Sequence, residues 1–225
     1  MTTSQKFTPC AVFYVPENEA EGYRKAGLSV VAVPDSVRGI TATRNWILDN
    51  TAEARVVMVD DDANAVGWVE FDGVKGYHRK MSQDELLAEF GKCFDVTEDL
   101  HYRIWGCATH SSPRAVYPYR PFLWRSYVTA SCIGIRNDTG VRFDPAFPVK
   151  EDYELTLRCV KEDGGVVAAR YFYWQNPHWR GDGGCKDYRT QDIEARAIAE
   201  LIKRYPGMIR QVTRGGAEFS VNLDF

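Results

Sequence analysis

The stretch ARVVMVDDDANAV, residues 54–66, runs four apolar residues directly into three consecutive aspartates. The apolar run, Val56 to Val59, consists mostly of β-branched residues and predicts a buried strand. Carboxylates within a few ångströms of one another resist ionisation unless a cation or hydrogen-bond donors compensate their charge. The end of this strand is therefore the first place in the chain where we expect a functional site.

Strand-like and helix-like segments alternate ahead of this strand. Strands are expected at 10–15 and 28–33, and helices at 18–26 and 40–50. That alternation, with nearly continuous apolar strands, predicts βαβ units and an α/β fold with a Rossmann-like, mostly parallel sheet flanked by helices. In such sheets ligands bind beyond the carboxyl ends of the strands, where the three aspartates lie.

The second half of the chain continues the α/β pattern around one long loop. The capping box Ser82-x-x-Glu85 predicts a helix over 82–94. Further strands are expected at 101–107, 128–136 and 166–174, and further helices at 151–163 and 191–205. No repeat or linker divides the chain, so we expect a single domain over residues 1–225.

Composition excludes several classes of protein. With 225 residues, of which 44% are hydrophobic, the chain can bury a sizeable core, and a net charge of −3 gives no global attraction to nucleic acid. The six cysteines form no C-x-x-C pair, and neither a signal peptide nor an apolar run of about 18 residues is present. We expect a soluble, cytoplasmic protein with reduced thiols, no membrane contact and no evident protein partner.

The aspartates form a D-x-D pattern in which Asp60 and Asp62 can face one point as the chain leaves the sheet. Mg²⁺ and Mn²⁺ typically take one or two carboxylates and complete their shell with water and phosphate oxygens. The pattern therefore predicts a divalent cation with a diphosphate. The alternative is an acidic turn that only solvates the end of the strand.

Three strings resemble the nucleotide-sugar glycosyltransferases of the GT-A fold. They are RNWILDN (44–50) followed by VVMVDDDA (56–63), then FPVKEDYELTLR (147–158) and YWQNPHWRGDGGC (173–185). Within that superfamily the chain resembles the TET-associated glycosyltransferases, phage enzymes that put sugars on 5-hydroxymethylcytosine in DNA. A domain of the vertebrate protein GREB is also similar to them. The resemblance covers about residues 10 to 190.

This resemblance implies a hexosyltransferase that uses a nucleoside-diphosphate sugar, a UDP-hexose or UDP-N-acetylhexosamine, together with Mn²⁺ or Mg²⁺. The donor-binding half would be about residues 10–100, and the acceptor and catalytic half about 101–225. If a phage encodes the chain, it would act in the host cytoplasm. A transferase with a protein, glycan or lipid acceptor and a non-catalytic nucleotide-sugar-binding module are the alternatives. A haloacid-dehalogenase-like phosphatase is disfavoured, because two βα units precede the D-x-D pattern.

The resemblance also implies which residues bind the donor. Asp62 would hold the metal, Asp60 would contact the metal or the sugar and ribose hydroxyls, and His178 would be a third contact. The other expected contacts of the nucleotide and diphosphate are Pro16, Glu17, Asp35, Arg44, Asn45, Asp61, Gly183 and Gly184. Alternatively His178 is an ordinary surface histidine, the two glycines form a simple turn, and Arg44 pairs with a surface carboxylate.

Glu151 and Asp152 at the start of a predicted helix are the candidates for catalysis. A hydroxyl that attacks an anomeric carbon must lose its proton, and Asp152 is the expected general base. The roles of Asp152 and Glu151 can be exchanged, and acidic residues are also common at helix starts because of capping and the helix dipole. A single base without a second nucleophile implies inversion at the anomeric carbon.

The long loop SPRAVYPYRPFLWRSY, residues 112–127, interleaves arginines with aromatic residues. That combination is typical of phosphate contacts with base stacking. The expected acceptor residues are Arg114, Tyr119, Arg120, Trp124 and Arg125, with DNA that contains 5-hydroxymethylcytosine as the partner. A target base in a duplex would have to be flipped out. The alternative is a proline-rich loop whose aromatic side chains fill the core.

Overall fold

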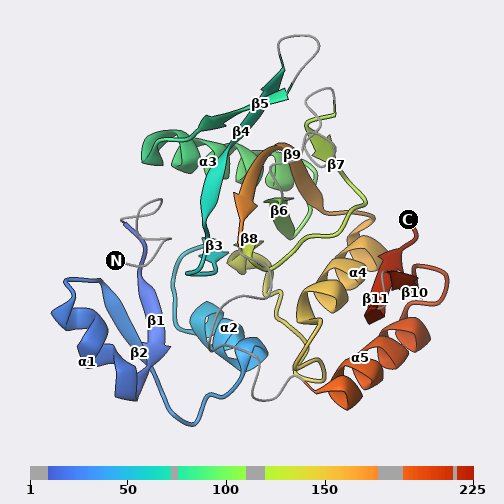
Figure 1. Cartoon of the computed structure of the whole chain (residues 1–225), viewed down its shortest axis with the longest axis horizontal. Coiled ribbons are helices and arrows are strands. Elements are labelled where there is room, and N and C mark those ends of the chain that lie inside the picture. Colours follow the sequence, from blue (N-terminus) through green and yellow to red (C-terminus); the bar gives the residue numbers. More distant parts are fainter. Residues whose placement is uncertain (1–9, 72–75, 110–119, 177–189, 215–216) are drawn as a thin grey trace.

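The computed structural model describes residues 10–71, 76–109, 120–176, 190–214 and 217–225. Figure 1 shows the arrangement of the elements. In chain order they are β1 (Phe13–Pro16), α1 (Glu17–Lys25), β2 (Val30–Val33), α2 (Ile40–Asp49), β3 (Arg55–Val59), β4 (Ala65–Phe71), β5 (Gly76–Lys80), α3 (Gln83–Asp99), β6 (Ile104–Ala108), β7 (Phe122–Leu123), β8 (Cys132–Arg136), α4 (Glu151–Asp163), β9 (Val167–Gln175), α5 (Gln191–Arg204), β10 (Ile209–Arg214) and β11 (Ala217–Leu223).

The central sheet has the order β3-β8-β6-β9-β4-β5, with β7 paired to β9, and the pairs β1-β2 and β10-β11 form two small sheets. The predicted α/β fold with a sheet flanked by helices is confirmed. Strand directions are more mixed than expected, because β1-β2 and β6-β9 pair in parallel whereas the other neighbouring strands run antiparallel. A continuous apolar run indicates burial of both faces of a strand and carries no information about its direction.

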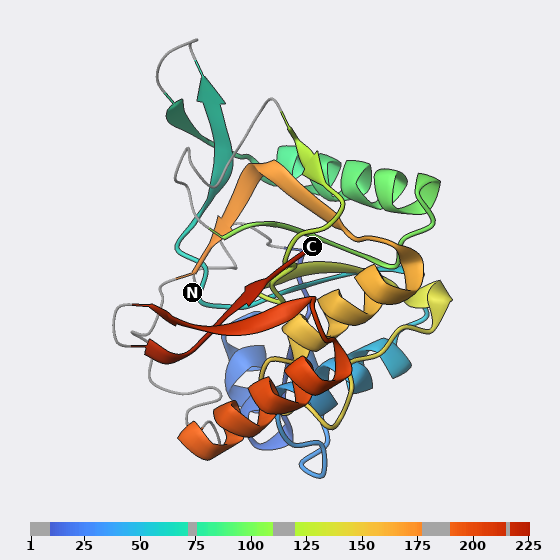
Figure 2. The same cartoon turned by 90° about the vertical axis from the view of Figure 1, so that its right-hand side faces the viewer.

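Both faces of the central sheet are covered, which Figure 2 shows with α3 on one side and α4 with α5 on the other. Along β6, Ile104 packs toward the cluster that contains α2 and α4, while Trp105 packs toward α3. In β8, Cys132 and Ile133 divide between the same two clusters. This period-2 alternation splits the apolar core into two layers. A third cluster joins α5 to α4 and to the β10-β11 hairpin.

Local sequence signals explain where helices begin. The capping box at α3 is present, since Ser82 accepts a hydrogen bond from the Glu85 backbone N–H and the Glu85 side chain accepts one from the Ser82 N–H. Thr190 caps α5 by accepting from the Ile193 N–H at 3.3 Å.

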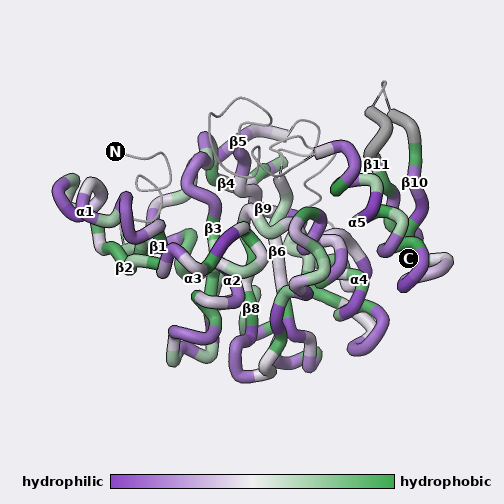
Figure 3. The backbone as a smooth tube through the Cα atoms, turned by 90° about the horizontal axis from the view of Figure 1, so that it is seen from below, coloured by the Kyte–Doolittle hydropathy of each residue, from purple (hydrophilic) through white to green (hydrophobic). Residues whose placement is uncertain are grey.

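The hydrophilic α1 lies at the edge of the molecule, whereas hydrophobic residues line β3 and β8 in its middle (Figure 3).

Two hairpins and the short strand β7 were not among the expected elements. The β4-β5 hairpin follows the aspartates directly, and β5 is a mostly exposed strand with the polar sequence GYHRK. The β10-β11 hairpin follows α5. The exposed polar strand β5 lacks the apolar alternation that identifies strands in a sequence. Strands β4 (AVGWVEF) and β11 (AEFSVNL) do carry apolar residues, which were a usable signal.

The strand directions place several carboxyl ends at one edge. Strand β3 runs antiparallel to β8, β8 antiparallel to β6, and β6 parallel to β9, so β3 and β9 end on the same side. The chain therefore delivers Asp60 after β3 and Asn176 after β9 to one edge of the sheet.

Neither a membrane span nor a disulfide occurs in the part of the chain that the structure describes. No helix there has the length and apolar character needed to cross a bilayer. The five described cysteines are free thiols, and four of them are buried.

Candidate active site

The acidic turn joins β3 to β4 at the edge where β9 also ends. The Asp60 N–H donates to the Ser131 carbonyl at 3.0 Å, which extends the pairing of β3 with the residue before β8. The Asn64 N–H donates to the Gln175 carbonyl at 2.8 Å. The three aspartates are therefore held between two fixed backbone contacts, with Asp61 and Asp62 exposed and Asp60 partly exposed.

One amide group joins two of these carboxylates. Asn176 Nδ2 lies 2.5 Å from Asp62 Oδ1 and 3.4 Å from Asp60 Oδ2, and donates to both. Two carboxylate oxygens thus converge on one point, as the D-x-D pattern predicts.

Arg44 of α2 connects the acidic turn to the start of α4. Its side chain is buried, and the guanidinium donates to Glu151 Oε1, to the Ala130 carbonyl at 3.1 Å and to Asp60 Oδ1 at 3.4 Å. Its Cζ also lies 5.5 Å from the centre of the Phe143 ring. A buried arginine needs such partners, because an unpaired charge in the interior is costly. The surface ion pair with Asp49 or Glu53 that was the alternative is therefore not the arrangement observed.

The start of α4 supplies the two catalytic candidates. Lys150, the residue before the helix, has a φ of +57°, a left-handed conformation that costs a non-glycine residue about 1–2 kcal/mol. Its ammonium lies 2.9 Å from Glu194 Oε2 of α5, and both side chains are buried. This contact fixes the direction in which α4 begins, with Glu151 buried against Arg44 and Asp152 partly exposed beside it.

Asp152 is oriented by three hydrogen-bond donors. Its Oδ2 accepts from the hydroxyl of Tyr127 and from the Ala130 N–H at 3.4 Å, and its Oδ1 accepts from the Tyr153 N–H at 2.9 Å. The rings of Tyr127 and Tyr153 stack with centroids 4.2 Å apart. The carboxylate is thus fixed in orientation while part of it stays accessible to solvent.

Burial, together with neighbouring carboxylates, makes two of these groups weaker acids. Burial raises the pKa of Asp60 to about 6, Arg44 opposes the shift, and Asp62, Asp152 and Asp61 reinforce it. Burial and the neighbouring Asp152 raise the pKa of Glu151 to about 7 against the opposing effect of Arg44. Strongly shifted carboxyl groups gathered in one place are typical of functional sites.

The expected nucleotide contacts from the first two strands lie together in the small β1-β2 sheet. The parallel pairing of Pro16 with Val33 brings Pro16, Glu17 and Asp35 to the same edge of the β1-β2 sheet. The pKa of Tyr23 in α1 is raised by partial burial and by the negative charges of Asp61 and Glu19.

Asn45 is engaged differently from its neighbour Arg44. Its side-chain amide donates to the Phe143 carbonyl and accepts from the Phe143 N–H, both at 2.8 Å. These two bonds dock α2 on the segment that leads to α4. In this structure Asn45 positions Arg44 rather than joining the carboxylate cluster.

The expected acceptor residues that the structure describes lie around β7. Arg120, Trp124 and Arg125 are exposed. The ring of Trp124 stacks on Phe122 at 5.9 Å, and Arg125 Nε donates to the Gly164 carbonyl at 3.3 Å. The remaining sequence candidates, Arg114, Tyr119, His178, Gly183 and Gly184, lie outside the described residues.

The described part of the site can be tested for its fit to a metal. No group of three or more histidine, cysteine or acidic side chains is gathered there for a cation. Asp60 and Asp62 do converge on the Asn176 amide, so a cation in its place would meet two carboxylate oxygens. Two carboxylates suit Mg²⁺ or Mn²⁺ when water and phosphate oxygens complete the shell. The residues present fit such an ion.

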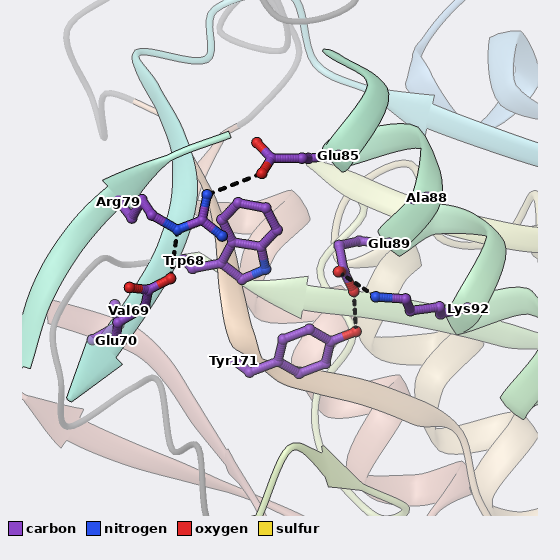
Figure 4. A pocket seen from close by; sticks show the side chains of 9 residues that line it. All are labelled: Trp68, Val69, Glu70, Arg79, Glu85, Ala88, Glu89, Lys92 and Tyr171. Atoms are coloured by element: carbon purple, nitrogen blue, oxygen red, sulfur yellow. Dashed lines mark hydrogen bonds and ion pairs between the residues drawn. The ribbon is translucent and has the colours of Figure 1, made fainter. Parts of the chain in front are cut away.

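A cavity of about 460 Å³ lies elsewhere, between the β4-β5 hairpin, α3 and Tyr171 (Figure 4). Arg79 lies 3.7 Å from the Trp68 ring centre and pairs with Glu70 and Glu85, while Glu89 bonds Lys92 and Tyr171. A charged ligand would have to break these pairs. We therefore assign the chemistry to the carboxylate cluster and not to this cavity.

Two residues of the cluster, Tyr127 and Asn176, were not among the sequence candidates. Asn176 lies within a string that signalled the site, directly after a predicted strand, so its position at a strand end was a usable signal. Nothing in the local sequence distinguishes Tyr127 from the other aromatic residues of the long loop.

An α/β fold with polar side chains gathered beyond the carboxyl ends of its strands is the arrangement in which such proteins bind nucleotides. The model of the TET-associated glycosyltransferase family matches residues 4–184, well over half of the chain. The chain therefore belongs to this family. No curated protein sequence matches it.

Among solved structures, the chain is similar to S. aureus TarS, residues 1–349, with 13% identity and a TM-score of 0.44. That match covers 82% of this chain and 52% of the TarS chain. A crystal structure of the same TarS segment in complex with UDP gives 13% identity and a TM-score of 0.45, covering 85% and 55%. The chain thus spans about half the length of these structures.

Proposed function

We propose that the chain transfers a hexose or N-acetylhexosamine from a UDP-sugar to the hydroxyl of 5-hydroxymethylcytosine in DNA, with Mn²⁺ or Mg²⁺ and with inversion at the anomeric carbon. The observation that carries the proposal is that Arg44 bonds both Asp60 and Glu151. Asn176 joins Asp62 to Asp60, and Asp152 directly follows Glu151. Residues from two motifs about 90 positions apart meet at one edge of the sheet, so a donor site and a base can act on the same anomeric carbon.

The residues divide the work as follows. Asp62 and Asp60 would hold the cation, which when bound neutralises charge on the departing nucleoside diphosphate. Asp152 would accept the proton of the acceptor hydroxyl. At the same time the hydroxyl oxygen would bond to the anomeric carbon, and the bond from that carbon to the diphosphate would break. Arg44 keeps Asp60 and Glu151 in place through its hydrogen bonds to both. His178 would be a further metal or diphosphate contact.

The burial and contacts of Glu151 support a single-displacement mechanism. Its carboxylate is buried and bound to Arg44. A double displacement needs a carboxylate that is free to attack the sugar, and Glu151 is not free in this way. Asp152 is the partly exposed carboxylate of the pair. One accessible base then activates one hydroxyl for a direct attack, which inverts the anomeric carbon.

The proposed donor site predicts that the Asp62→Asn variant loses metal-dependent affinity for UDP-sugars. Its affinity for UDP-sugars in Mn²⁺ should fall by more than about tenfold, because a ligand of the cation is lost. A thermal-shift titration with UDP and several UDP-sugars, with and without Mn²⁺, measures this, since a ligand stabilises by about RT ln(1 + [L]/Kd). The Asp60→Asn variant should lose less of this affinity. The charge-matched control is Asp99→Asn, at the exposed end of α3. An Asp62→Asn protein with wild-type affinity in Mn²⁺ refutes the metal assignment.

The acceptor half is tested by product analysis. The enzyme, Mn²⁺ and a panel of sugar nucleotides are incubated with duplex DNA that contains 5-hydroxymethylcytosine, which is then digested to nucleosides for mass spectrometry. A nucleoside heavier by one hexose or N-acetylhexosamine is the expected result. Labelling of a protein, glycan or lipid instead, with no DNA product, would exclude DNA as the acceptor while leaving the glycosyltransferase class intact.

A further inference from the structure

A second cavity, of about 320 Å³, opens between the segment before β8, the start of α4 and the strand β11. Tyr127 and Tyr153 line one side of it, and Asn222 and Phe225 line the other. Figure 1 shows the β10-β11 hairpin lying beside α4, far from α1 and the β1-β2 unit. The cavity thus lies beside the start of α4 and far from the β1-β2 unit.

We propose that this cavity holds the acceptor, a nucleotide unit of DNA with its base between the tyrosine pair and β11. The inference rests on the proposed function and adds to it a wall from the C-terminal hairpin. That wall, residues 221–225, lies beyond residue 184, where the match to the family model ends.

The distance to the chemistry supports the assignment. Tyr127 lines the cavity, and its hydroxyl donates to Asp152. A group bound in the cavity is therefore one side chain away from the proposed base. Cavities of about 300 Å³ are at the small end of those that bind ligands, a size suited to a single nucleotide unit.

The chemistry of the lining favours a base with an adjacent phosphate. The stacked tyrosine pair offers an aromatic surface, and Val221 and Leu223 continue it with apolar side chains. Ser126 and Asn222 supply polar groups at the rim. Base stacking on an aromatic side chain is worth about 1–3 kcal/mol per base.

Charge distinguishes this cavity from the donor site. Of the residues that the structure describes, Arg125 is the one charged side chain that lines it, and no acidic side chain does. Among the described residues Arg125 makes a hydrogen bond to a backbone carbonyl and no ion pair, so its positive charge is available to an anion. A cation-bound diphosphate needs carboxylates, whereas the phosphate backbone of DNA needs an arginine of this kind.

The test uses the full chain and a fluorescent duplex with one 5-hydroxymethylcytosine, whose binding is followed by anisotropy over a range of salt. Arg125→Gln should weaken binding at least fivefold and reduce the slope of log K against log salt by about one. Asn222→Ala should weaken binding severalfold with little change of slope. Arg24→Gln, on the exposed face of α1, is the matched charge control and should bind as the wild type does.

A cavity-filling variant, Ser126→Trp, gives a second, independent measurement. It should abolish sugar transfer to the same DNA while UDP-sugar affinity in Mn²⁺ and the melting temperature stay near wild type. If the wild type labels DNA and all three cavity variants match it, the cavity assignment is wrong and the proposed function stands. If the wild type neither binds nor labels this DNA, both are wrong.

Discussion

At the scale of single residues, the site is a set of carboxylates whose roles are separated by their hydrogen-bond partners. Glu151 and Asp152 are adjacent in sequence, yet Glu151 is buried against Arg44 and Asp152 faces Tyr127 with part of its surface exposed. The local sequence favours Asp152 as the base but also allows the two roles to be exchanged. The partners favour Asp152, because a base must reach a substrate hydroxyl.

Replacing Asp152, the proposed base, should affect turnover without affecting the binding of the donor. Asp152→Asn should keep donor affinity and lower kcat by about 10²–10⁴-fold, because it removes a proton acceptor and leaves the donor contacts in place. Steady-state kinetics with a UDP-sugar titration measures both quantities. Tyr127→Phe, which removes one hydrogen bond to the same carboxylate, should lower kcat by less, roughly 3–10-fold.

The control for this prediction is Glu151→Gln. It should lower the melting temperature, since Arg44 loses its charged partner in the interior, but it should not reproduce the loss of turnover at unchanged donor affinity. Equal losses of donor affinity and turnover in Asp152→Asn would show that Asp152 is structural.

At the scale of elements, β6 and β8 pack closely in the middle of the central sheet. Gly134 of β8 pairs opposite Trp105 of β6, and a Cβ at Gly134 would lie 1.9 Å from the indole Nε1. The Trp105 ring is fully buried and packs on Phe90 and Phe94 of α3. Only glycine therefore leaves room for the ring between the sheet and α3.

This contact predicts a large effect of Gly134→Ala. The added methyl group should displace Trp105 and lower the free energy of unfolding by at least about 1–3 kcal/mol, as overpacking of a core does. Thermal unfolding should show a drop of roughly 2–4 °C per kcal/mol for a chain of this size. Gly22→Ala in α1, where no atom lies within 4 Å of the added carbon, should instead be neutral or slightly stabilising. A melting temperature unchanged by Gly134→Ala would contradict the packing described.

At the scale of the whole molecule, the carboxylate cluster couples stability to pH. The pKa values of Asp60 and Glu151 are raised from ordinary values of 3.8 and 4.5 to about 6 and about 7. The folded state therefore binds these protons more tightly than the unfolded state. Their contribution to stability is full below about pH 4 and is lost as the pH rises through 6 and 7.

This linkage predicts that, without metal, the cluster's contribution to the free energy of unfolding falls between pH 5 and pH 8. Urea unfolding at a series of pH values should show a shallower fall for Asp60→Asn, which lacks one titrating group, than for the wild type. The exposed Asp99→Asn is the control. Mn²⁺ at pH 8 should stabilise the wild type more than Asp60→Asn. Identical pH profiles for Asp60→Asn and the wild type would show that Asp60 is not coupled to the cluster.

The sequence by itself determined the elements with a strong local signal. The apolar run before the aspartates, the capping box at Ser82 and the acidic start of α4 each carry their information within a few residues, and each element is present. The strings around them were also sufficient to indicate the glycosyltransferase family that the family model matches. Burial and capping are local properties, so a single sequence records them.

Only the tertiary structure decided which polar groups meet. The direction of the strands, the pairing of Arg44 with Glu151 and the contacts of Tyr127 and Asn176 depend on residues about 25 to 116 positions apart. Such contacts form because buried charges require partners, and several partners satisfy that requirement equally well until the sheet fixes the distances. The hairpins β4-β5 and β10-β11 were also not predicted, and neither was the second cavity that β11 lines. Their positions depend on the pairing of strands and on packing against the rest of the molecule.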